Sequence, residues 1–293
     1  MTDRVQRPNG WALVAPWPAG VLLALLNAEI SAVTTPVFAV LATAYLVGAA
    51  TVIRRAARAE LWPAVVLVAV PAGLFVGAGY TGEPTAREPT GLLINTAVLF
   101  VVAVALAVAM IGLTWKLRSA PGASAAVPAV VLLTLGTGGF LLNLLARTAI
   151  VLTGASSQQL AVEDLHWSAA QYLRGLSGPV DFVGYTMVWL DLVQLAYVVS
   201  AFAGVAGAAV LATTASAVPR RAGTLLAGTA CGLGATCVIA VVAAVALPRG
   251  TDVVPATVAF VLTIPFMATL LPAALGAALL AAPKTSDALQ ESK

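Results

Sequence analysis

Two carboxyl side chains lie in long apolar segments, where charged groups are unusual. Glu29 lies near the outer end of the first segment, and Asp191 lies within a later one with apolar residues on both sides. A charge at the bilayer centre costs about 2.5–3.5 kcal/mol, so such residues normally face the interior of a helix bundle. Burial disfavours the charged form of a carboxyl, which lets one carboxyl donate a proton while another accepts one. We interpret Glu29 and Asp191 as candidate catalytic acid–base residues.

Further polar and aromatic residues accompany these carboxyls. Arg147 follows Gly136, Gly139 and Asn143 at helical spacing, so one face of that helix is small and then polar. Gly184, Val188, Asp191 and Gln194 also share a helical stripe, which we expect to face the bundle. The candidate substrate-binding residues are Asn27, Asn143, Arg147, Tyr185, Trp189 and Gln194.

Each charged candidate also has a purely structural interpretation. Glu29 could touch water or lipid headgroups in a short outer hairpin. Asp191 could anchor the fold through a hydrogen bond or salt bridge. Arg147 could extend its guanidinium outward to the headgroups, or pair with Asp191 or Glu29 inside the bundle. The sequence predicts a polar pocket beneath the outer surface only where the helices bring these faces together.

Other kinds of catalytic site are excluded by residue type. The chain has two cysteines, Cys231 and Cys237, and one histidine, His166, which is too few for a thiolate–imidazole metal site. It has no G-x-x-x-x-G-K-[ST] loop for ATP. No cluster of five or more Lys and Arg exists, so nucleic acid is not an expected partner. We therefore expect acid–base chemistry without a metal or cofactor.

Composition places the chain in a membrane. Of its 293 residues, 60% are apolar and 9% are charged, and the mean hydropathy is +0.98. A soluble domain carries roughly 25% charged residues. The apolar segments far exceed the ~10 residues of a barrel strand, which predicts an all-α, polytopic bundle. We expect a multi-pass protein of the cell membrane, with the lipid bilayer as its first partner.

About eight transmembrane helices are expected in a single domain. The predicted spans are Trp11–Ala32, Pro36–Ile53, Leu61–Tyr80, Gly91–Thr114, Val127–Thr153, Phe182–Ala215, Gly223–Leu247 and Pro255–Ala282. The domain covers residues 1–293, with cytoplasmic tails at 1–10 and 283–293 and an outer interfacial segment at 154–180. Two G-x-x-x-G pairs, Gly73/Gly77 and Gly228/Gly232, are interpreted as helix-packing sites.

The loop charges predict the orientation. Eleven of the 15 Lys and Arg residues fall before the first span or after the second, fourth, sixth and eighth spans. The opposite loops are richer in acidic residues, including Glu83, Glu88 and Asp252. By the positive-inside rule, both termini are expected in the cytoplasm.

The order of the two carboxyls resembles that in the small integral-membrane terpene cyclases of fungal and actinobacterial meroterpenoid and indole-sesquiterpene pathways. Glu29 in Asn27-Ala28-Glu29 matches the early membrane Glu of that family, and Asp191 matches the late membrane Asp. Two departures stand out, because the family usually has an aromatic residue where Ala28 stands and typically has seven helices. The resemblance implies protonation-initiated cyclisation of a hydrophobic prenylated substrate.

Two other functions stay open on the sequence. Acidic residues within spans also serve proton coupling in transporters and permeases. Against this alternative, the polar residues gather near one side, and no polar track crosses the membrane. A non-catalytic membrane subunit would need no site at all. The sequence leaves the choice between a homo-oligomer and a hetero-oligomer open.

Overall fold

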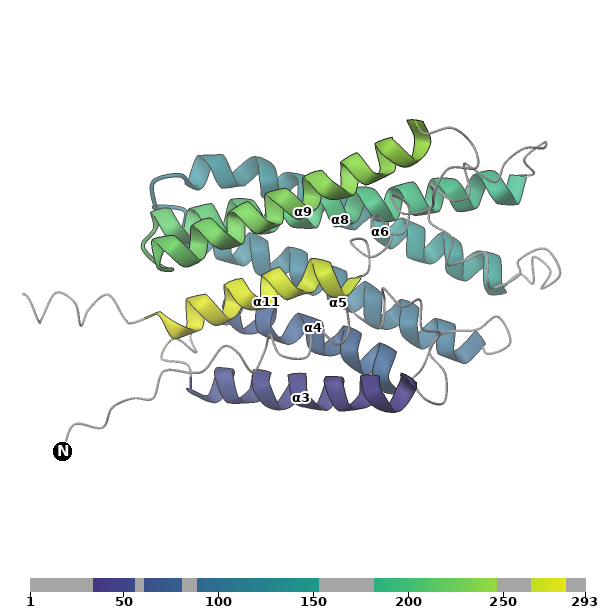
Figure 1. Cartoon of the computed structure of the whole chain (residues 1–293), viewed down its shortest axis with the longest axis horizontal. Coiled ribbons are helices and arrows are strands. Elements are labelled where there is room, and N and C mark those ends of the chain that lie inside the picture. The colour runs from purple at the N-terminus through teal and green to yellow at the C-terminus, as the bar shows by residue number, and fades with distance from the viewer. Residues whose placement is uncertain (1–33, 56–60, 81–88, 153–181, 247–264, 283–293) are drawn as a thin grey trace, which may run out of the picture.

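The described part of the chain is wholly helical. The computed structural model describes residues 34–55, 61–80, 89–152, 182–246 and 265–282, and these form seven α-helices and no strand. The helices are α3 (Thr34–Arg55), α4 (Trp62–Tyr80), α5 (Pro89–Lys116), α6 (Ala123–Leu152), α8 (Phe182–Thr214), α9 (Arg220–Ala246) and α11 (Pro265–Ala281). They run side by side along the long axis of the molecule (Figure 1).

The helices fall where the apolar segments predict them. The predicted spans 36–53 and 182–215, for example, correspond to α3 and α8. Within the described residues, four helical stretches are long and apolar enough to cross a membrane: Thr96–Lys116, Ala123–Ala149, Leu192–Thr214 and Arg220–Ile239. Three shorter apolar helices accompany them. The predicted first span, the interfacial segment 154–180 and both tails lie outside the described residues.

Helix α8 lies at the centre of the packing and contacts α5, α6, α9 and α11. Its side chains are buried on more than one side, as at Ala201, Phe202 and Val205. Small residues permit this close packing. A Cβ on Gly207 would lie only 2.6 Å from the Cβ of Ala129 in α6, so the two backbones approach closely at this point.

A second packing centre forms around α4, which contacts α3, α5 and α11. Pro71 lies inside α4 and cannot donate a backbone hydrogen bond, which weakens the ladder one turn earlier. The hydroxyl of Tyr45 in α3 donates to the carbonyl of Val68 at 2.7 Å. A polar group is thus satisfied between two apolar helices, and α3 is fixed against α4.

Candidate functional site

A buried amide joins α6 to α8 close to the position of Asp191. The side chain of Asn143 is fully buried, and its Nδ2 donates to the backbone carbonyl of Leu190. A buried amide without a partner would cost about 1–3 kcal/mol, so this bond fixes the register of the two helices. Asp191 is the next residue of α8 and therefore lies at the level of this contact.

Arg147 extends the polar contact by one helical turn. Its Nε donates to Asn143 Oδ1 at 2.8 Å, and the side chain is half-buried. The guanidinium is thus hydrogen-bonded within α6, and its pairing with Asp191 or Glu29 stays a prediction, because both carboxyl side chains lie outside the described residues. The amide of Asn143 accepts from the cation and donates to the carbonyl of Leu190, so one side chain links Arg147 to α8.

Helix α5 contributes a third side to this group. Thr148 Oγ1 lies 3.4 Å from the hydroxyl oxygen of Thr96 and donates to the carbonyl of Leu144 at 2.8 Å. Together, Thr96, Asn143, Arg147, Thr148 and the carbonyl of Leu190 make up what we call the polar junction. It draws polar groups from α5, α6 and α8, spread over about one and a half turns of α6.

Two glycines bring α6 and α8 together next to the polar junction. A Cβ on Gly136 would lie 2.0 Å from Ser200 Oγ, and one on Gly139 would lie 3.5 Å from Val193 Cγ1. Across the same contact, the ring of Phe140 in α6 stacks on that of Tyr197 in α8, with centroids 4.4 Å apart and planes 5° apart. The face of α6 that carries Gly136, Gly139 and Asn143 therefore packs on α8, a partner that its spacing did not identify.

The face of α8 that meets α6 differs from the predicted stripe. Leu190, Val193, Tyr197 and Ser200 contact α6. The stripe that holds position 191 continues along α8 at Gln194, Val198 and Ala201. Gln194 is half-buried, while Val198 and Ala201 are buried. Both stripes therefore face other helices, which follows from the central place of α8.

The remaining predicted site residues are distributed as follows. Glu29 and Asn27 lie outside the described residues. Asp191 and Tyr185 lie within α8, but their side chains are outside the described part of the structure. Trp189 is 56% exposed, although the next residue, Leu190, is fully buried. The structure thus brings together Asn143 and Arg147, and it adds the backbone carbonyl of Leu190, which residue type alone could not indicate.

No metal cluster forms among the described residues, where no three His, Cys, Asp or Glu side chains come together. The polar junction offers a guanidinium, an amide and two hydroxyls. Asn143 already donates to Leu190 and accepts from Arg147, and the hydroxyl of Thr148 donates to Leu144.

The chain matches no family model, no curated protein and no solved structure.

Replacing Arg147 with methionine tests the junction directly. Asn143 Oδ1 would lose its described donor inside the protein, and we expect the free energy of unfolding to fall by about 1–2 kcal/mol. The measurement is thermal unfolding of the purified protein in detergent. Arg54→Met, at an exposed position at the end of α3, is the matched control and should unfold like the parent. Unchanged unfolding of Arg147→Met would contradict the structural role of the junction.

Proposed function

We propose that the chain is a multi-pass protein of the cell membrane with eight transmembrane helices and both termini in the cytoplasm. The long apolar helices and the alternation of loop charges support this topology. A reporter fused after Lys293 should be cytoplasmic, and one inserted at Thr85 should be extracytoplasmic. The opposite result at either site would contradict the orientation.

We propose further that the protein is a membrane-embedded terpene cyclase in which Glu29 and Asp191 act as acid and base. The observation that carries this proposal is the bond from the buried Asn143 to the carbonyl of Leu190. It holds the residue before Asp191 against a helix that carries Arg147. Of two carboxyls in apolar surroundings, one can keep its proton and donate it while the other accepts one.

The reaction needs no cofactor, because atoms and electrons balance within the substrate. A proton adds to a terminal alkene carbon or an epoxide oxygen of the prenyl chain. The resulting cation is attacked by the π electrons of the next alkene, which forms a carbon–carbon bond and moves the cation. A carboxylate finally removes a proton and leaves a new alkene. The product is an isomer of the substrate, and the apolar bundle excludes water that would otherwise capture the cation.

The test is an assay of purified membranes with plain and epoxidised prenylated aromatic substrates. We expect a product of unchanged mass and altered chromatographic retention. In D₂O, protonation of an alkene would add one non-exchangeable deuterium to the product, whereas an epoxide would gain an exchangeable one. Inactivity of the parent on every substrate, together with proton-coupled solute uptake into vesicles, would replace the cyclase with a transporter.

A further inference from the structure

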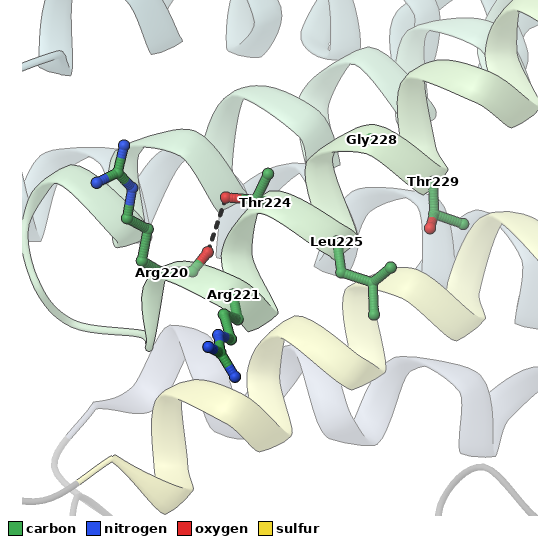
Figure 2. Close-up of a pocket in the computed structure, with 6 residues that line it drawn as sticks. All are labelled: Arg220, Arg221, Thr224, Leu225, Gly228 and Thr229. Carbon is green, nitrogen blue, oxygen red and sulfur yellow. Dashed lines mark hydrogen bonds between the residues drawn. The ribbon is translucent and has the colours of Figure 1, made fainter.

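A groove on the outer surface of α9 lies at the end of the bundle opposite the polar junction. It is lined by Arg220, Arg221, Thr224, Leu225, Gly228 and Thr229 and has a volume of about 890 Å³. Figure 2 shows the two arginine side chains leaving the first turn of α9 in different directions, with Leu225 and Thr229 further along the same helix. The groove thus has a cationic end and an apolar, small-residue end.

The cationic end suits a phosphate group. Arg220 and Arg221 are both exposed, so neither guanidinium is buried against another helix. They also lie at the N-terminus of a 27-residue helix, where unpaired backbone N–H groups and the helix dipole favour an anion. Under the predicted orientation, this end of α9 lies at the cytoplasmic surface, where membranes carry anionic lipids.

The rest of the groove suits an acyl chain. Arg221, Leu225, Gly228 and Gly232 follow one another along a single helical stripe. No described atom comes within 4 Å of a Cβ built on Gly228 or Gly232, and Leu225 is 71% exposed. The stripe from Arg221 to Gly232 is about 16 Å long at 1.5 Å per residue. Half of a ~30 Å hydrocarbon core is about 15 Å, so the stripe matches one leaflet.

We propose that this groove binds one anionic phospholipid of the cytoplasmic leaflet, with its phosphate at Arg220 and Arg221 and an acyl chain along Gly228 and Gly232. A second copy of the chain is the less favoured occupant. Parallel contact through the two glycines, related by a two-fold axis, would bring Arg221 of each copy near its counterpart, where like charges repel. The inference rests on the membrane location and is independent of the cyclase reaction.

The experiment compares retention of phosphatidylglycerol and phosphatidylcholine by the purified chain, using native mass spectrometry. We expect the parent to prefer phosphatidylglycerol by about tenfold and the double variant Arg220→Gln/Arg221→Gln to lose that preference. Gly228→Leu should reduce retention of long-chain phosphatidylglycerol, because its side chain would occupy the groove. The matched controls are Arg54→Gln, at another exposed arginine, and Gly138→Leu, at a glycine where a Cβ also meets nothing within 4 Å.

The controls decide between a site and general surface charge. Both control variants should retain the preference of the parent. If Arg54→Gln loses the preference as strongly as the double variant, or if the double variant behaves like the parent, the groove is not the site. Cys231 is exposed on α9 next to Gly232, so cross-linking at this cysteine tests whether a second copy of the chain occupies the groove. Efficient Cys231–Cys231 cross-linking that Gly228→Leu abolishes would assign the groove to a second copy instead.

Discussion

Asp191→Asn is expected to lower the rate of prenyl-chain cyclisation by about 10²–10⁴-fold, the usual contribution of a general acid or base. Asparagine is nearly isosteric with aspartate but cannot take up the proton that the final step releases. The helix itself should be unaffected, because the bond between Asn143 and the carbonyl of Leu190 involves only the backbone of α8. We therefore expect the loss in kcat, with thermal unfolding close to that of the parent.

Three further variants complete this test. Glu29→Gln should cause a loss of similar size, since it removes the other carboxyl of the pair. Asp287→Asn makes the same chemical change in the predicted cytoplasmic tail and should keep full activity. Gln194→Leu lies on the helical stripe of Asp191 and removes a polar group that cannot exchange a proton, so its effect should fall on KM more than on kcat. Full activity of both Asp191→Asn and Glu29→Gln would contradict the acid–base mechanism.

Much of the helical arrangement could be predicted, because membrane helices are long apolar segments and basic loops separate them. The spans predicted at 36–53, 61–80 and 182–215 match α3, α4 and α8 to within about two residues. The contact face of α6 was also predictable. Glycines followed by Asn143 and Arg147 at helical spacing mark one side of a helix that is otherwise Ala, Val and Leu.

The partner face on α8 could not be predicted for a physical reason. Helix α8 is apolar almost all round and buried against several neighbours, so polarity does not distinguish the face toward α6 from the others. Its decisive acceptor is the backbone carbonyl of Leu190, which any residue type carries. The stripe with Asp191 was predicted to face the bundle because it holds a charge, whereas Leu190 and Ser200 make the contact with α6.

The pair Gly228/Gly232 shows a related limit. The G-x-x-x-G spacing predicted close helix packing, yet no described atom lies within 4 Å of a Cβ on either glycine. The glycines that α6 and α8 use for close approach include Gly136 and Gly207, which meet Ser200 and Ala129 of the opposite helix. Spacing within one helix indicates a smooth surface, but the sequence does not say what covers that surface.

The second large expected effect is a loss of stability when a side chain is added where α6 and α8 approach each other closely. Gly136→Ala would place a Cβ 2.0 Å from Ser200 Oγ and 2.9 Å from Ser200 Cβ, well inside van der Waals contact. Rotation of the serine hydroxyl relieves only the first clash, so the helices must separate. We expect the free energy of unfolding to fall toward the upper end of the ~1–3 kcal/mol typical of overpacking. Asn143 lies two turns further along α6, so the same separation should weaken its bond to Leu190 and reduce activity.

A compensating substitution makes this prediction specific. In Gly136→Ala/Ser200→Gly, both clashing atoms are gone, and the nearest remaining atom is the Cα of Tyr197 at 3.4 Å. The double variant should recover most of the stability, with a coupling free energy of about 1–3 kcal/mol between the two positions. Gly138→Ala is the matched control, because its Cβ meets nothing within 4 Å and alanine favours a helix. If Gly136→Ala unfolds like Gly138→Ala, the contact between α6 and α8 is looser than described, and the polar junction would lose its main support.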